Sequence, residues 1–148
     1  MIMQFAAGGI VFRQTQNFNS KSQFSKKRIE ILVCQHSQHH GWVFPKGLIG
    51  DHVDNENKEE TALREVKEET GILGKIIKPL DPIEYWFVLD GEKIKKTVYY
   101  FIMECVLGDT KKHDFEMEKV EWLEKEEVEE RLTYESDKQV WQEAEKLI

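Results

Sequence analysis

The chain has 148 residues, about the length of one domain, with 40 % apolar and 33 % charged residues. This composition excludes collagen-like, low-complexity and wholly disordered chains. The formal charge of −7 opposes the attraction that drives non-specific binding to DNA, so no DNA partner is expected. No apolar run reaches the roughly 18 residues of a membrane span, and the first residues lack the pattern of a signal peptide. We therefore expect a single cytoplasmic domain over residues 1–148, without a membrane partner.

The first part of the chain predicts two strands, over residues 4–12 and 28–34. Residues 14–27 between them are polar, so we expect a mobile and dispensable loop. A short apolar piece over 41–44 then ends at Pro45-Lys46-Gly47, where a turn or loop is expected.

A helix is predicted from the signals that mark its two ends. Asn57 and Glu60, three residues later, form a capping-box pattern at its start. Gly71 stands where a left-handed cap would end it, after Thr70.

The rest of the chain predicts more strands and two helical segments. Asp90-Gly91 is a strong hairpin signal between neighbouring strands. The predicted strands are 72–77, 83–89, 93–107 and 120–123, and the helical segments are 125–131 and 136–148. The expected class is α/β, with antiparallel pairs in a mixed β-sheet.

One motif spans the predicted helix and the loop before it. It reads Gly50-x5-Glu56-x7-Arg64-Glu65-Val66-x-Glu68-Glu69-x-Gly71-Ile72. Glu65, Glu68 and Glu69 share a helix face at 3.6 residues per turn, so their carboxylates are expected to converge. Like charges at this spacing destabilise a helix, which suggests that a cation occupies the cluster. Oxygen ligands favour Mg²⁺ or Mn²⁺. A merely solvated acidic face would not require every motif position to be filled.

This motif resembles the signature of the Nudix hydrolase family, and the likeness covers nearly the whole chain. It extends to Ala6-Ala-Gly-Gly-Ile-Val, Phe44-Pro-Lys-Gly and Val120-Glu-Trp-Leu. The resemblance implies a Nudix-type α/β/α sandwich and hydrolysis of a nucleoside diphosphate linked to another group.

The loop before the helix departs from the family pattern. In similar family members the glycine of Phe-Pro-Lys-Gly is itself the first glycine of the motif. Here eight residues separate Gly47 from Glu56, which suggests a three-residue insertion. We favour Gly47 over Gly50 as the equivalent glycine, and therefore as a backbone ligand of the metal.

The resemblance also implies roles for the charged residues. Glu65, Glu68 and Glu69 would hold Mg²⁺, Arg64 would orient the acidic side chains, and Glu56 would support them. The general base would be either Glu65 or the later Glu116. Arg64 could pair with Glu60 or Glu68 at four-residue spacing.

The hairpin around Asp90 is similar to that of the bacterial diadenosine tetraphosphate hydrolase group, as is Trp42-Val-Phe-Pro-Lys-Gly. Tyr85 or Tyr100 could stack on a purine, although core packing is the default for strand aromatics. Lys46 could bind a polyphosphate, together with one of Lys93, Lys95 and Lys96, of which we favour Lys96. The implied partner is a small nucleotide, with diadenosine tetraphosphate preferred.

Other interpretations stay open. The substrate could be a damaged nucleoside triphosphate, an RNA 5′ end or a diphosphoinositol phosphate, and a catalytically silent nucleotide sensor is a further alternative. Cys34 with three histidines would suit zinc, but alternate strand positions point apart. His39 or His40 could instead contact a substrate phosphate. The oligomeric state is not predicted.

Overall fold

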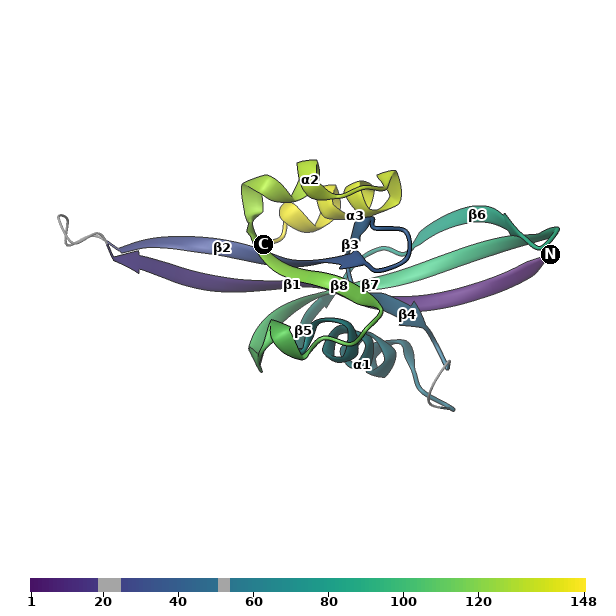
Figure 1. The fold of residues 1–148 in the computed structure, drawn as a ribbon, viewed down its shortest axis with the longest axis horizontal. Helices are drawn as coiled ribbons and strands as arrows, with labels where there is room; N and C mark the ends of the chain where they lie inside the picture. The colour runs from purple at the N-terminus through teal and green to yellow at the C-terminus, as the bar shows by residue number, and fades with distance from the viewer. Residues whose placement is uncertain (19–24, 51–53) are drawn as a thin grey trace.

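One mixed β-sheet runs the length of the computed structural model, which describes residues 1–18, 25–50 and 54–148 (Figure 1). Within these residues the sheet has eight strands, and its main path is β3-β2-β1-β7-β5. Strand β4 pairs with β1, β6 with β7, and β8 with β2. The strands are β1 (Ile2–Phe18), β2 (Ser25–His36), β3 (Trp42–Val43), β4 (Lys46–Leu48), β5 (Ile72–Pro79), β6 (Ile83–Leu89), β7 (Glu92–Gly108) and β8 (Met117–Glu124).

Helices cover both faces of this sheet, which confirms the expected α/β/α arrangement. Helix α1 (Lys58–Thr70) lies on one face, and α2 (Val128–Arg131) and α3 (Glu135–Glu145) lie on the other (Figure 1). Two 3₁₀ turns, η1 (Thr110–Lys112) and η2 (Lys125–Glu127), complete the described structure. No helix of the described residues is long and apolar enough to cross a bilayer.

The two cores follow from the period of two along the central strands. On β1, Ala6 and Ile10 pack toward the core that includes α2 and α3, whereas Ala7 and Val11 pack toward α1. The first core also contains Phe44, Tyr100 and Trp141, the largest fully buried side chains near α3. Burial on both faces explains why the middle of β1, from Ala6 to Val11, carries no polar side chain.

Helix α1 begins and ends as the sequence predicts. The side chain of Asn57 accepts a hydrogen bond from the backbone N–H of Glu60 at 2.8 Å. Gly71 has φ +78° and donates its N–H to Lys67 O, which ends the helix. These two caps therefore fix both ends of the helix that carries the carboxylates.

The β6–β7 hairpin is also confirmed, with positive φ at both Asp90 and Gly91, as a tight two-residue turn requires. The expected loop over 14–27 is partly wrong. Residues 14–18 and 25–27 belong to β1 and β2 and pair in antiparallel register from Gln14↔Ile29 to Phe18↔Ser25. Backbone pairing extends these strands beyond the point where their apolar residues stop, and residues 19–24 lie outside the described part.

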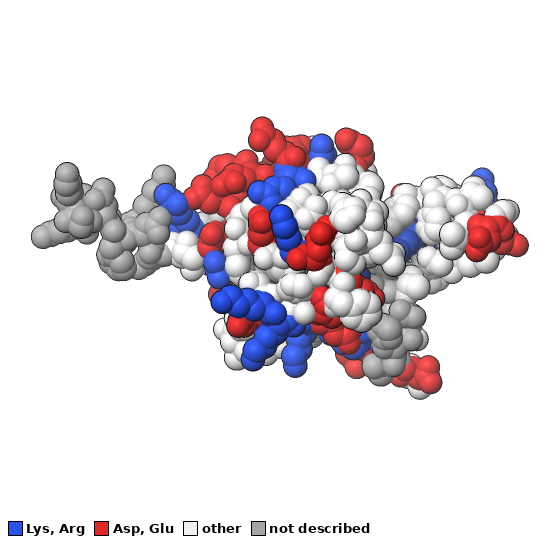
Figure 2. Space-filling model, viewed as in Figure 1, with Lys and Arg blue, Asp and Glu red and all other residues white. Residues whose placement is uncertain are grey.

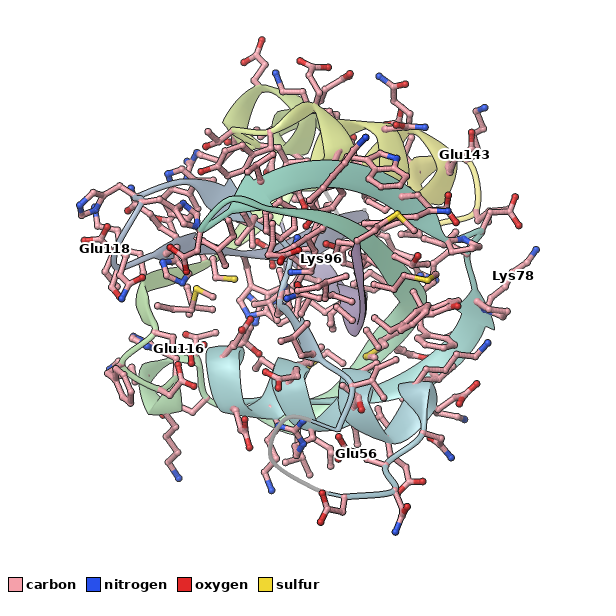
Figure 3. All side chains as sticks on the ribbon, turned by 90° about the vertical axis from the view of Figure 1, so that its right-hand side faces the viewer. Glu56, Lys78, Lys96, Glu116, Glu118 and Glu143 are labelled. Carbon is pink, nitrogen blue, oxygen red and sulfur yellow. The ribbon has the colours of Figure 1, made fainter. Side chains whose placement is uncertain are left out.

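Charge is distributed unevenly over the surface. Acidic side chains gather over α2 and α3, on the side of the sheet opposite α1 (Figure 2). A view along the sheet places Lys96 near the centre, Glu116 beside one end of α1, and Glu56 on the side of α1 away from the sheet (Figure 3). The formal charge of the chain therefore does not describe the local charge of any one site.

Candidate functional site

Helix α1 carries two carboxylates into the protein interior. Glu65 and Glu69 are only 4 % and 3 % exposed, on the same side of the helix as the buried Ala62 and Val66. Residues four positions apart are separated by about 40° around a helix, so consecutive turns present these two groups together.

Glu68 does not join them at this surface, which corrects the expectation of three converging carboxylates. Its position lies about 100° around the helix from Glu69, because each residue advances by that angle. The Glu68 side chain is 42 % exposed, and its Oε2 accepts a hydrogen bond from Arg64 Nη1 at 3.0 Å.

Arg64 connects the acidic residues of the motif. Its Nε donates to Glu56 Oε2 at 2.9 Å, and its Nη1 donates to Glu65 Oε1 at 2.9 Å. The hydrogen bond with Glu56 is the largest cause of a raised Arg64 pKa, and Glu65 adds to it. The guanidinium therefore fixes the orientation of Glu56, Glu65 and Glu68 with charge-assisted hydrogen bonds.

Strand β4 brings the backbone against the two buried carboxylates. The N–H of Lys46 donates to Glu69 Oε2 at 3.1 Å. A Cβ added to Gly47 would overlap the carboxyl group of Glu65, so any side chain at this position would displace that carboxylate. Gly50 has φ +79° and nothing within 4 Å of its added Cβ. Gly47 is therefore the glycine that adjoins the carboxylates, and residues 51–53 of the loop that follows lie outside the described structure.

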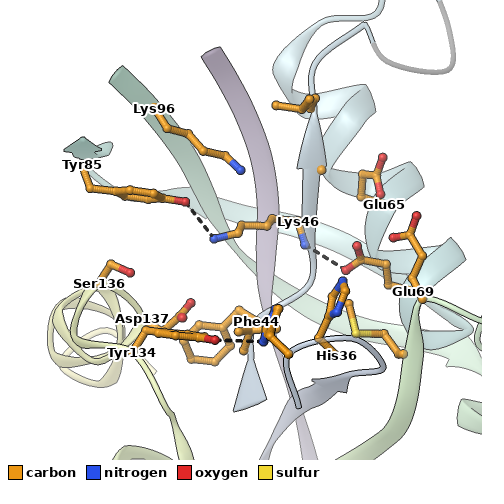
Figure 4. A pocket seen from close by; sticks show the side chains of 16 residues that line it. His36, Phe44, Lys46, Glu65, Glu69, Tyr85, Lys96, Tyr134, Ser136 and Asp137 are labelled. Carbon is orange, nitrogen blue, oxygen red and sulfur yellow. Dashed lines mark hydrogen bonds between the residues drawn. The ribbon is translucent and has the colours of Figure 1, made fainter. Parts of the chain in front are cut away.

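A cavity of about 600 Å³ opens beside these groups (Figure 4). Glu65, Glu69 and Glu116 line it together, although Glu116 comes from a segment far away in the sequence. Its other walls come from β2, β4, β6, β7 and the start of α3. The lining residues are His36, His39, Val43, Phe44, Lys46, Gly47, Leu48, Glu65, Glu69, Tyr85, Lys96, Glu116, Met117, Tyr134, Ser136 and Asp137.

The carboxylate wall has the chemistry of a site for a hard cation. Burial raises the pKa of Glu69, and the neighbouring charges of Glu65, Glu116 and Asp114 raise it further, while the N–H of Lys46 lowers it. A bound cation would offset this repulsion, and oxygen donors suit Mg²⁺ or Mn²⁺. Among the described residues, no three acidic, histidine or cysteine side chains are already close enough to hold an ion. The donor type fits, and binding would require these side chains to turn toward the ion.

The opposite wall carries cations and an aromatic ring. Lys46 Nζ donates to the hydroxyl of Tyr85 at 3.4 Å and lies 5.6 Å from the centre of its ring. Lys96 lies on the neighbouring strand, opposite Tyr85 in the register. Burial, followed by the charge of Lys46, lowers the pKa of Lys96 to about 8. This wall therefore matches the expected substrate contacts Lys46, Tyr85 and Lys96 in position.

The other candidates on this hairpin lie elsewhere. Lys93 and Lys95 stand over the ring of Trp86, at 4.7 and 5.7 Å from its centre, and neither lines the cavity. Tyr100 is 1 % exposed, packs in the core with Phe44, and donates its hydroxyl to Asp137 Oδ1 at 3.3 Å. Its ring has no free face for a base, so the expectation of stacking by Tyr100 is corrected to one of core packing.

Sequence reasoning missed the wall formed by the start of α3. Tyr134, Ser136 and Asp137 line the cavity, and Asp137 is buried with a pKa raised by burial. Their only signal was an acidic and polar helical segment, which is typical of any solvated helix. The zinc alternative gains no support, because the Cys34 thiol is fully buried and donates to the carbonyl of Val43.

Comparison with known proteins identifies the family. Residues 18–143 match the NUDIX domain. The chain belongs to the NUDIX family. It is 39 % identical over 108 residues to a Mycobacterium tuberculosis protein named MutT4, covering 72 % of this chain and 42 % of that protein. It is 38 % identical over 101 residues to a rat asymmetrical bis(5′-nucleosyl)-tetraphosphatase, covering 67 % of this chain and 63 % of that protein.

Solved structures of NUDIX proteins share the fold. A Caenorhabditis elegans Ap4A hydrolase binary complex matches with a TM-score of 0.72 at 22 % identity, covering 97 % of this chain and 96 % of that one. A MutT protein of Bacillus halodurans matches with a TM-score of 0.70 at 25 % identity, covering 94 % and 80 %. This chain spans less than two thirds of the length of the two sequence relatives above.

Proposed function

We propose that this NUDIX protein is a Mg²⁺-dependent pyrophosphohydrolase for a nucleoside diphosphate linked to another group, and that its preferred substrate is diadenosine tetraphosphate. One observation carries the proposal. A single cavity has buried carboxylates on one wall and two lysines with a half-buried tyrosine on the other. A polyphosphate that ends in a base is complementary to both walls at once.

The carboxylate wall would carry the chemistry. Glu65 and Glu69 would hold Mg²⁺ with the backbone carbonyl of Gly47, and Glu68 would join them only by turning away from Arg64. The bound ion would supply charge for the phosphoryl oxygens and lower the pKa of the attacking water. Arg64 would keep Glu65 in place, and Glu56 would keep Arg64 in place through the hydrogen bonds described above. The proton of the water would go to Glu65 or to Glu116, which both line the cavity.

The opposite wall would hold the substrate. Lys46 and Lys96 would neutralise the polyphosphate, and the ring of Tyr85 would stack on one adenine. Tyr134 lies across the cavity from Tyr85 and offers a second aromatic surface (Figure 4). The similarity to a rat asymmetrical tetraphosphatase supports a dinucleotide over other substrates.

A substrate panel tests this proposal. The purified protein is incubated with diadenosine tetraphosphate, ATP, 8-oxo-dGTP, triphosphorylated RNA and a diphosphoinositol phosphate, with Mg²⁺ or with EDTA. We expect cleavage of diadenosine tetraphosphate to ATP and AMP, with the highest kcat/KM of the panel and none with EDTA. Another substrate that exceeds it by tenfold would overturn the substrate, and no cleavage of any of them would favour a nucleotide sensor.

A further inference from the structure

His36, His39 and Tyr134 form a chain of three rings along the cavity. The imidazoles of His36 and His39 are stacked, with centroids 4.3 Å apart and planes 10° from parallel. Tyr134 meets His39 edge-on at 5.5 Å. All three residues line the cavity. The ring of Tyr134 therefore packs edge-on against His39, which in turn stacks on His36.

The hydrogen bonds define the protonation state of His39. The backbone N–H of Gly41 donates to His39 Nδ1 at 3.0 Å, and the Tyr134 hydroxyl lies 2.9 Å from the same nitrogen. A backbone N–H can only donate, so this Nδ1 must be an unprotonated acceptor. The proton of the neutral ring is then on Nε2, and the hydroxyl of Tyr134 is a donor. Protonation at Nδ1 would set its N–H against the Gly41 N–H, which can only donate, and the Tyr134 hydroxyl would have to reverse its role to keep a contact, so the present arrangement would be lost.

The backbone passes close to both rings at Gly41. A Cβ added to Gly41 would lie 2.6 Å from the ring of Tyr134 and 2.8 Å from His39 Nδ1. The next residue is also tied to the segment that carries Tyr134, because Trp42 N–H donates to Thr133 Oγ1 at 2.8 Å and Thr133 N–H donates to Trp42 O at 3.1 Å. The loop and the tyrosine therefore form one connected unit, in which Nδ1 is the shared acceptor.

The groups around His39 favour its neutral form. Burial, and then His36 on β2, Lys46 on β4 and His40 in the loop, all lower the pKa of His39. Glu118 on β8 interacts with His40 Nδ1 instead, and Tyr134 ahead of α3 supplies a neutral hydroxyl. Glu116 and Asp137 also line the cavity, but the surroundings as a whole still disfavour the imidazolium.

We propose that neutral His39 is a positioning residue, which holds Tyr134 as a wall for the nucleoside end of the substrate and releases it on protonation. This inference rests on the proposed function, because it assigns Tyr134 to substrate binding. His39 would not contact the reacting phosphate. Its protonation would therefore weaken the affinity for the nucleoside while leaving the catalytic step in place.

The test compares the wild type with three single-residue variants, two at His39 and one at His40. In His39→Asn, the side-chain oxygen can replace Nδ1 as the acceptor but cannot titrate. His39→Leu removes the acceptor. His40→Asn removes a neighbouring exposed histidine and leaves Nδ1 of His39 in place. Thermal melting first confirms that each variant is folded.

Two readouts follow. We expect ¹⁵N NMR of the wild-type imidazoles at pH 8 to show His39 protonated on Nε2 only, and acid to move the Tyr134 ring resonances in the wild type but not in His39→Asn. We expect the KM for diadenosine tetraphosphate to rise about fivefold or more in the wild type and in His40→Asn as the pH falls from 7.5 into the range below 6.5 where His39 becomes protonated, with the size of a lost stacking contact. KM should stay level in His39→Asn and be raised at both pH values in His39→Leu.

The outcomes separate the two proposals. A proton on Nδ1 at pH 8, or the same pH dependence of KM in the wild type and His39→Asn, would overturn the role of His39. A normal KM in His39→Leu would also overturn it. If no form of the protein cleaves the dinucleotide, the proposed substrate fails, and the NMR comparison still decides whether His39 holds Tyr134.

Discussion

The two walls of the cavity are built in different ways. Most of the carboxylate wall comes from one helix, in which Arg64, Glu65 and Glu69 lie within six consecutive residues. The opposite wall draws on β4, β6, β7, the loop after β2 and the start of α3. The carboxylate wall can stay the same while the opposite wall changes, because each strand and loop of the opposite wall can vary separately. Substitutions in the carboxylate wall should therefore lower kcat, whereas substitutions in the opposite wall should raise KM.

The largest effect is expected at Glu69. Glu69→Gln should lower kcat by at least about a hundredfold, since the loss of metal-mediated charge stabilisation is felt on this scale. Without metal, the melting temperature should stay level or rise, because a buried carboxylate among like charges has been removed. The matched control is Glu68→Gln, which changes an exposed partner of Arg64 outside the cavity and should cost about tenfold or less. An equal fall in kcat in the two variants would contradict the assignment of metal binding to the buried Glu69 rather than to the exposed Glu68.

The second prediction compares two glycines of the same loop. Gly47→Ala should lower kcat/KM by more than about tenfold, because its methyl group would displace the Glu65 carboxylate and small misplacements are costly in catalysis. Gly50→Ala meets open space and should cost only about 1–2 kcal/mol of backbone strain, with little change in activity. The measurements are steady-state kinetics and thermal melting, and the reverse ranking would make Gly50 the functional glycine.

The third prediction concerns the aromatic wall. Tyr85→Ala should raise KM for diadenosine tetraphosphate by about fivefold to a hundredfold, since base stacking contributes about 1–3 kcal/mol. kcat and the Mg²⁺ requirement should be unchanged, because the lost contact is equal in the ground and transition states. Tyr100→Phe is the comparison, as it removes only a buried hydroxyl and should change KM little. A fall in kcat alone for Tyr85→Ala would place this ring at the chemistry.

The smallest effect is a pH dependence at Lys96. Its pKa of about 8 lies below the ordinary value of 10.5, so the folded protein loses this charge as the pH rises through 8. Because burial disfavours the charged form, its destabilising effect is full below pH 8 and is relieved between pH 8 and 10.5. We expect KM to rise severalfold between pH 7.5 and 9 in the wild type but not in Lys96→Arg, which stays charged. The same rise in both proteins would assign the titration to another group.

Local sequence signals predicted the helix that carries the carboxylate wall. The residues of the opposite wall depend on long-range packing and could not be predicted in this way. The caps at Asn57 and Gly71 depend on neighbours within the helix, so its ends could be predicted to the residue. Tyr85 and Tyr100 could not be told apart in this way. Helix α3 covers Tyr100 through Asp137 and Trp141, whereas Tyr85 faces the cavity beyond the helix. The sequence of the strands does not indicate where α3 will lie, because Asp137 is 37 residues away from Tyr100.

The pairing of β1 has a consequence for how the chain folds. From Ile2↔Ile94 to Phe12↔Glu104, β1 is parallel to β7, and each residue of β1 pairs with one that lies 92 positions later in the chain. During synthesis β2, β4 and α1 can therefore cover part of β1 first, but its other edge stays unpaired until β7 leaves the ribosome. Closing such a loop is slow compared with forming hairpins or helices. We therefore expect the arrival of β7 to set the moment at which the sheet, and with it the cavity, first exists.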